Sequence, residues 1–124
     1  MIPIDEATTE QCVAALAKLD QGQVPKYPML LEFCLCPAHP GPQHECICHG
    51  LGYVPNVSLE ALFDALHTGG WHFRIQQTRT HPPFASLWKS FRDGTAGSAE
   101  GFEPMPVLIS RALCKAEGLR EIEA

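Results

Sequence analysis

Apolar and polar residues alternate along residues 71–77 (WHFRIQQ), and this period of two predicts a half-buried β-strand. Residues 84–91 (FASLWKSF) predict a second strand, in which Trp88 points opposite to Leu87 only if no bulge intervenes. The RDG sequence at residues 92–94 is a turn signal, and residues 95–103 hold a short third strand at most. The pattern therefore predicts two or three antiparallel strands.

Three other segments repeat their apolar residues at helical spacing. The first is residues 5–19, the second follows a natural N-cap at Ser58 and ends at Gly69 or Gly70, and the third starts near residues 104–106 and stops before Gly118. The apolar stripes consist of Cys12, Val13, Leu16 and Leu19; of Leu59, Leu62, Phe63 and Leu66; and of Leu108, Ile109, Ala112, Leu113 and Ala116.

This order of elements predicts an α+β fold, with helices packed on a small antiparallel sheet of two to three strands. A chain of 124 residues is long enough for one modest core, so we expect a single domain over residues 1–124. Residues 1–32 form its N-terminal helix and connector, residues 33–52 a loop inserted after the first helix, and residues 53–124 a helix-strand-strand-helix core.

The composition is that of an ordinary soluble protein, with 45% hydrophobic and 19% charged residues. No apolar run is long enough to span a membrane, and the acidic start MIPIDEATTE does not resemble a secretory signal. We therefore expect a cytoplasmic location, where thiols stay reduced and clustered cysteines favour metal binding over disulfides.

Four of the six cysteines gather in residues 33–52 (FCLCPAHPGPQHECICHGLG), as two C-x-C pairs separated by nine residues. Two thiolate pairs at this spacing can converge on one tetrahedral Zn²⁺, and the glycines and prolines after each pair let backbone amides approach the sulfurs. The first candidate ligand set is therefore Cys34, Cys36, Cys46 and Cys48.

Histidines offer alternative ligands. His39 and His49 each follow a cysteine with the two-residue gap common in metal knuckles, which makes a Cys2His2 set, and His44 is a further alternate. Thiolate softness favours the four-cysteine set. Free thiols and disulfides are the weaker interpretations. Cys12 and Cys114 lie on or beside helical stripes, so we interpret them as buried small hydrophobic residues.

A zinc ion with four protein ligands is structural, and it would order a loop that has no other means of ordering itself. A catalytic zinc needs an open position and a general base, and only Glu32 and Glu45 lie close in sequence. Neither belongs to a catalytic motif, so we name no catalytic residue and rank a metal-dependent enzyme as a distant alternative.

Basic and aromatic residues interleave between residues 71 and 92, and no Asp or Glu occurs between residues 65 and 92. Aromatic rings can stack on bases while cations meet phosphates, so this stretch is a candidate surface for single-stranded nucleic acid. The simpler interpretation is that the aromatic residues form the core face of the sheet and the cations its solvated face. The candidate residues are Trp71, Arg74, Arg79, Trp88, Lys89 and Arg92.

Two resemblances extend this picture. The sequences GGWHFRIQQ, FRDGTAGSAE and PVLISRALCKAEG resemble the phage ABA sandwich, a family of small phage and prophage domains. That resemblance covers about half of the chain and implies a phage or prophage origin, a host-cytoplasm location and a helix–sheet–helix arrangement. The second cysteine pair also resembles the C-x-x-C-x-G-x-G modules of DnaJ-type chaperones. This resemblance implies a metal knuckle, and nothing about chaperone activity is carried over from it.

Taken together, the sequence predicts a small, zinc-stabilised, phage-like interaction protein that acts by binding another protein rather than by catalysis. A nucleic-acid-binding zinc module that uses residues 71–92 is the alternative. The net charge of −5 argues against a protein that coats nucleic acid with its whole surface.

Overall fold

The computed structural model describes residues 1–33, 53–90, 92 and 94–122. Its largest sheet has three antiparallel strands in the order β6-β7-β8: β6 is His72–Gln76, β7 is Phe84–Trp88 and β8 is Gly97–Glu100. The register is continuous, from His72 opposite Trp88 to Gln76 opposite Phe84. No bulge interrupts β7, so Leu87 and Trp88 point to opposite faces, as the regular alternation required.

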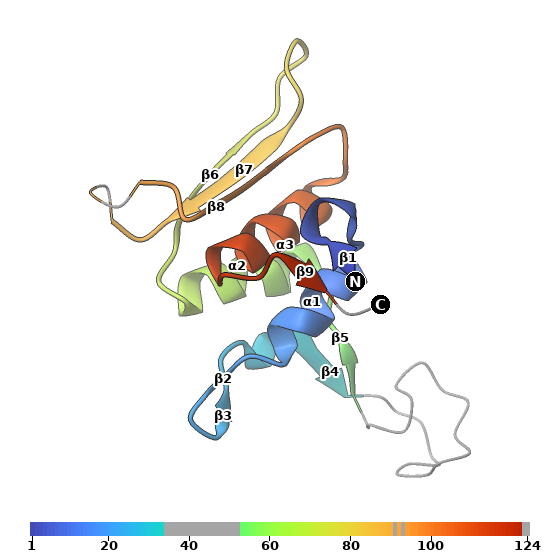
Figure 1. The fold of residues 1–124 in the computed structure, drawn as a ribbon, viewed down its shortest axis with the longest axis vertical. Helices are drawn as coiled ribbons and strands as arrows, with labels where there is room; N and C mark the ends of the chain where they lie inside the picture. Colours follow the sequence, from blue (N-terminus) through green and yellow to red (C-terminus); the bar gives the residue numbers. More distant parts are fainter. Residues whose placement is uncertain (34–52, 91, 93, 123–124) are drawn as a thin grey trace.

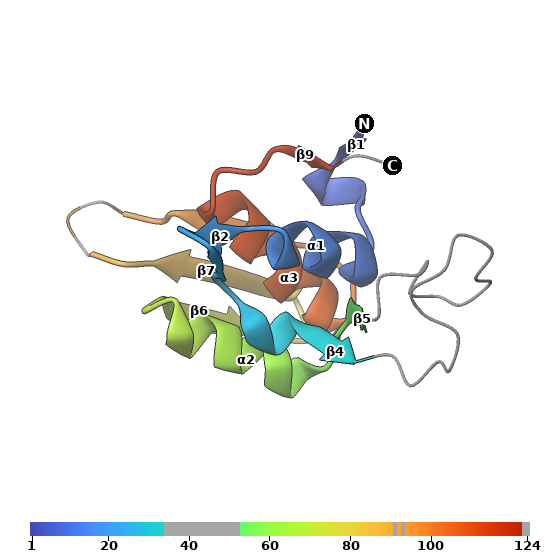
Figure 2. The same ribbon diagram turned by 90° about the horizontal axis from the view of Figure 1, so that it is seen from below.

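Three α-helices lie together on one side of this sheet (Figures 1 and 2). They are α1 (Thr9–Ala17), α2 (Leu59–Thr68) and α3 (Met105–Ala116). Helix α3 packs against β7 and β8, α2 packs beside it against β6, and α1 covers α3 on the side away from the sheet. The described helices therefore do not form the helix–sheet–helix sandwich that the phage resemblance implies. The predicted α+β fold, with helices on a small antiparallel sheet, is confirmed.

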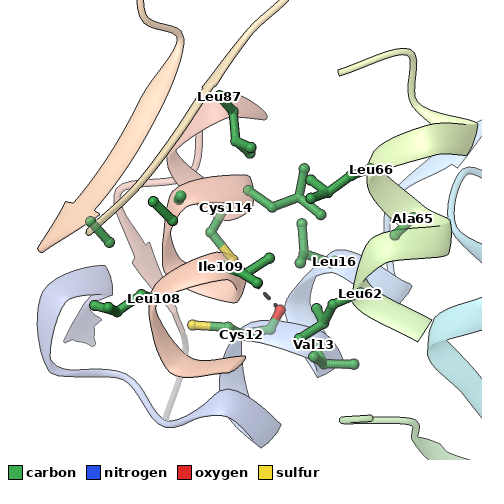
Figure 3. Packing of buried hydrophobic residues seen from close by; sticks show 14 of the residues in the cluster. Cys12, Val13, Leu16, Leu62, Ala65, Leu66, Leu87, Leu108, Ile109 and Cys114 are labelled. Carbon is green, nitrogen blue, oxygen red and sulfur yellow. Dashed lines mark hydrogen bonds between the residues drawn. The ribbon is translucent and has the colours of Figure 1, made fainter. Parts of the chain in front are cut away.

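The core lies between these helices and the inner face of the sheet (Figure 3). Its largest fully buried side chains come from every layer: Ile4, Val13, Leu16, Tyr27, Leu30, Leu62, Leu66, Leu87, Leu108, Ile109 and Leu113. Strand β7 contributes its alternate residues to the core: Ala85 and Leu87 are buried, while Phe84, Ser86 and Trp88 are only half-buried. At β8, Gly97 and Ala99 are the buried pair.

The start of the first helix was predicted wrongly at residue 5. A short 3₁₀ turn, η1 (Ile4–Glu6), comes first, and α1 begins only after Thr8. Thr8 and Gln11 form a reciprocal capping box: the Thr8 hydroxyl accepts from the Gln11 backbone N–H, and the Gln11 side chain accepts from the Thr8 N–H. This fixes the helix start more strongly than the dipole of the acidic residues before it. The Ser58 cap of α2 is confirmed, since its hydroxyl accepts from the Ala61 N–H.

Short two-stranded ladders complete the fold. Strands β1 (Ile2–Pro3) and β9 (Glu121–Ile122) pair near the two termini, and β2 (Asp20–Gln21) and β3 (Val24–Pro25) form a small hairpin after α1. A 3₁₀ turn, η2 (Pro28–Leu30), leads into β4 (Leu31–Phe33), which pairs with β5 (Tyr53–Pro55). The β4–β5 ladder lies beside α1, on the side of the helices away from the three-stranded sheet (Figure 1).

Candidate functional site

The β4–β5 ladder brackets the cysteine- and histidine-rich segment. The candidate ligands Cys34, Cys36, Cys46 and Cys48, with the alternates His39, His44 and His49, all lie outside the described residues. The strands on either side are described: Phe33 is the direct antiparallel partner of Tyr53, and Leu31 is the partner of Pro55. The chain therefore leaves and re-enters the described fold at one paired position.

This ladder is attached firmly to the core. Leu30, immediately before β4, is fully buried, and its carbonyl oxygen accepts a hydrogen bond from the Asn56 N–H at 2.8 Å. Strand β5 contacts α1, and η2 contacts both α1 and α2. Phe33 and Tyr53, which flank residues 34–52, are consequently held side by side by the β4–β5 pairing.

Cys12 and Cys114 are confirmed as buried, free cysteines. They lie on α1 and α3, and the Cys114 thiol donates to the Cys12 carbonyl oxygen at 3.6 Å (Figure 3). Hydrogen bonding to the Cys12 side chain, together with burial, raises the pKa of the Cys114 thiol. A protonated, inaccessible thiol is a poor nucleophile and a poor metal ligand, which supports a packing role for Cys114. Complete burial supports the same role for Cys12.

Trp71 was a candidate for base stacking, but the structure places it in the interior, with 8% of its surface exposed. Its indole Nε1 donates to the Tyr27 hydroxyl oxygen at 3.1 Å, and the Tyr27 hydroxyl donates to Glu117 Oε1. Lys26 Nζ forms an ion pair with Glu117 Oε2 at 2.7 Å. Burial, followed by the hydrogen bond to Glu117, raises the pKa of Tyr27. Trp71 therefore belongs to a buried polar network that joins the β3 region, α2 and α3.

Trp88 is placed differently, on the outer face of the three-stranded sheet. It lies opposite His72, with ring centroids 6.1 Å apart and an interplanar angle of 26°, so the two rings are stacked. Phe84 lies on the same face four residues earlier on β7. The outer face also carries Arg74, Ser86 and Ser98 in its middle row, and Gln76 and Glu100 beside Phe84.

The four cations of the stretch are distributed along and beyond β6 and β7. Arg74 is exposed on β6 and its guanidinium donates to Gln76 Oε1 at 3.3 Å, while Arg79 is exposed in the β6–β7 turn. Lys89 and Arg92 are exposed beyond the other end of β7, and Lys89 Nζ lies 4.4 Å from the centroid of the Trp71 ring. The structure thus keeps five of the six predicted nucleic-acid residues at the surface and buries the sixth, Trp71.

A surface hollow of about 450 Å³ lies next to the stacked rings. His72 and Trp88 line it from the sheet, and His67 and Gly70 line it from the end of α2, with Trp71 and Phe73 between them. His67 packs edge-on against Phe73, with centroids 6.0 Å apart. The hollow is therefore mainly aromatic.

The isolated histidines are at the surface, as expected. His67 and His72 make the ring contacts given above, and His81 Nδ1 is 2.9 Å from the Thr80 hydroxyl. Within residues 1–33, 53–90, 92 and 94–122, no three His, Cys, Asp or Glu side chains are grouped so that they could hold a metal ion.

Two features of the site were missed at the sequence level. The Tyr27–Glu117 pair joins residues 90 positions apart, and no local pattern signals it. Phe84 was not among the candidate site residues, although its position has the same parity as Trp88 on a regular strand, which places both rings on one face.

Comparisons of the chain with protein-family models, with curated proteins and with solved structures found no match. None of the helices in the described part of the chain has the length and apolar character needed to cross a bilayer.

Proposed function

We propose that the protein is a small interaction domain in which one Zn²⁺ orders residues 34–52, and that the ordered loop binds another protein. The proposed ligands are Cys34, Cys36, Cys46 and Cys48, with His39, His44 and His49 as alternates. The resemblance to small phage domains supports a phage or prophage origin, and a host-cytoplasm location follows from that origin.

The single observation that carries the proposal is the pairing of Phe33 with Tyr53. Zinc knuckles need two short ligand segments that meet at one point, and a loop with paired ends makes this convergence easier. Closing a loop costs conformational entropy, and the β4–β5 ladder already meets part of that cost. The first cysteine pair begins directly after β4, so it is tied closely to the ladder.

The composition of residues 34–52 supports a metal as the ordering element. The segment has only three large apolar residues, Leu35, Ile47 and Leu51, against three prolines and three glycines. Such a segment cannot bury enough apolar surface to offset its conformational entropy. A zinc ion supplies binding free energy that a small loop can use for folding.

A binding role for the loop follows from its position on the scaffold. Loops held by a rigid scaffold are the usual places for recognition residues. The described core closes around α1, α2, α3 and the sheet, and the ladder that carries the loop lies at its periphery (Figure 1). Recognition of a protein partner is therefore the role that this arrangement supports best.

The metal is tested by elemental analysis of the purified, untagged protein, together with cobalt substitution. We expect one zinc per chain, and the visible spectrum of the cobalt form distinguishes a four-thiolate set from a mixed thiolate and imidazole set. Serine at Cys46 and Cys48 should abolish metal binding, whereas alanine at His39 and His49 should leave it intact. A metal-free protein with two fewer free thiols per bridge would indicate disulfides and overturn the proposal.

The partner is tested by affinity capture from host extract, with the zinc-loaded protein and the Cys46→Ser/Cys48→Ser variant as a matched pair. We expect a protein retained only by the zinc-loaded form, and calorimetry with the purified partner should then give a stoichiometric complex. Equal retention by both forms, or no binding of the purified partner, would contradict a zinc-ordered recognition loop.

A further inference from the structure

The outer face of the three-stranded sheet has no described helix over it, although it carries two large aromatic side chains (Figures 1 and 2). Phe84 and Trp88 lie on β7, which is the central strand, and both are half-buried. Four strand residues at roughly 3.3 Å each separate them by about 13 Å. The two rings can therefore contact different units of one extended ligand.

The charge of this face selects the ligand. Residues 65–92 contain four of the nine Lys and Arg residues and none of the 14 Asp and Glu residues, so the rest of the chain has five cations against 14 carboxylates. Two exposed cations accompany the outer face: Arg74 lies on it in β6, and Arg79 lies in the β6–β7 turn beyond Phe84. Lys89 lies over the Trp71 ring on the helix side of the sheet and is not part of this face. On the outer face of the described strands, Glu100 is the only carboxylate, at the corner beside Phe84.

We propose that this face binds single-stranded nucleic acid, with bases on Trp88 and Phe84 and phosphates on Arg74 and Arg79. Cations along a track combined with aromatic platforms are what sequence-tolerant binding of single strands requires. A duplex fits less well, because its bases are already stacked. The acidic remainder of the molecule repels phosphates and so confines an anionic strand to this face.

The hollow beside the Trp88–His72 pair supports the same ligand class. Its volume of about 450 Å³ lies within the range of roughly 300–1,000 Å³ typical of small-molecule sites. Its lining includes the rings of His67, His72 and Trp88, so a planar base meets aromatic surface there. A terminal or flipped-out base is the part of a nucleic acid that such a hollow accommodates.

The test uses the full-length, zinc-loaded protein and a fluorescein-labelled 12-nucleotide oligothymidylate, with binding followed by anisotropy between 50 and 200 mM salt. We expect binding at 50 mM salt that weakens steeply with added salt, and quenching of tryptophan fluorescence because Trp88 is the accessible member of the two tryptophans. The matching duplex should bind at least fivefold more weakly.

Two variants and one control locate the site. Arg74→Glu should weaken binding at least fivefold and lower the salt slope by about 0.7 for the lost phosphate contact. Trp88→Leu should weaken binding roughly tenfold and remove most of the quenching. Arg120→Glu makes the same charge change at an exposed position next to β9, away from the sheet face, and should leave the affinity within twofold. Circular dichroism checks that each variant is folded.

Three outcomes would overturn the proposal. The first is the absence of binding at 50 mM salt and 100 µM protein. The second is an equal loss of affinity for Arg74→Glu and Arg120→Glu, which would mean that the oligonucleotide is attracted by overall charge and not by a defined site. The third is equally tight binding of a labelled 12-residue polyglutamate, which would mean that the face recognises an acidic protein segment instead of bases.

Discussion

The indole Nε1 of Trp71 donates a hydrogen bond to the hydroxyl oxygen of Tyr27 at 3.1 Å, although 44 positions separate the two residues. Through Glu117 this bond continues to α3, and through the ring of Trp71 it reaches Lys89. The network therefore connects the folded interior to Lys89 beyond the end of β7. Because all of its members are described side chains, its contribution to stability can be measured directly.

Replacing Tyr27 with Phe removes a donor to a carboxylate and the acceptor of a buried indole N–H. We expect the free energy of unfolding to fall by about 2 kcal/mol, since a hydrogen bond to a charged group and an unsatisfied buried donor each contribute in that range. Urea denaturation measures this change. Trp71→Phe removes only one bond of the network, so the double variant should lose less than the two single losses together. Full additivity would show that the bonds act independently.

The raised pKa of Tyr27 predicts a loss of stability at alkaline pH. The ordinary tyrosine pKa is 10.0, and in the folded protein the phenol keeps its proton to higher pH than in the unfolded chain. The unfolded state therefore binds fewer protons above pH 10, and stability falls as the pH rises beyond that value. Urea midpoints at pH 8, 10 and 11 test this, with Tyr27→Phe as control. The variant should have the shallower decline, and parallel declines would contradict the assignment.

Gly97 is the point of closest approach between β8 and α3. A Cβ atom at this position would lie 2.3 Å from the Ala112 carbonyl oxygen and 2.5 Å from the Ala116 nitrogen. Both are backbone atoms and cannot rotate away, so we expect Gly97→Ala to lower the free energy of unfolding by about 3 kcal/mol. Ser98→Ala, one residue further along on the exposed face, should change it by less than about 0.5 kcal/mol. Similar losses for both variants would show that α3 can shift.

Thiol reactivity separates the two classes of cysteine. Cys12 and Cys114 have no exposed surface, so a thiol reagent should modify them only after denaturation. In the native, zinc-free protein we expect four of the six cysteines to react, and in the zinc-loaded protein fewer. Mass spectrometry of the modified peptides identifies the sites. Rapid labelling of Cys114 in the native state would contradict its burial.

Removal of the metal should loosen the loop without unfolding the core. Helices α1, α2 and α3 and the sheet share one buried cluster of described residues. After chelation we therefore expect the helical circular dichroism signal to be nearly unchanged. We also expect new chymotrypsin cleavage between residues 33 and 53, where the sequence offers Leu35 and Leu51 as cleavage sites. Re-addition of zinc should restore protection. Loss of the helical signal would show instead that the metal holds the whole domain.

The fold was predictable where neighbouring residues determine the local structure. It was not predictable where contacts between residues far apart in the sequence determine it. The Ser58 cap, the strand alternation around Leu87 and the stop at Gly118, which has φ of +86°, are all visible in a few neighbouring residues. The late start of α1 was missed because a capping box at Thr8 competes with acidic residues that equally suit a first turn. Such competition depends on how Ile4 packs into the core, and the sequence alone does not determine that packing.

The candidate site also has a part that the sequence predicts and a part that only the three-dimensional arrangement shows. Parity along β7 places Trp88 and Phe84 on one face, but only the position of the helices shows that this face is the uncovered one. Trp71 precedes β6 but continues the alternation of Phe73 and Ile75 toward the core, whereas its hydrogen bond to Tyr27 is a contact that spacing does not reveal. The interpretation of the aromatic residues as core therefore holds for Trp71 and is wrong for Trp88 and Phe84.

The contact at Gly97 also has a consequence for finding relatives of this protein. Backbone meets backbone there, so a glycine on the strand opposite Ala112 and Ala116 on the helix is a steric requirement of this packing. A search for that small-residue pattern at the same offset can therefore detect distant relatives that whole-chain comparison does not.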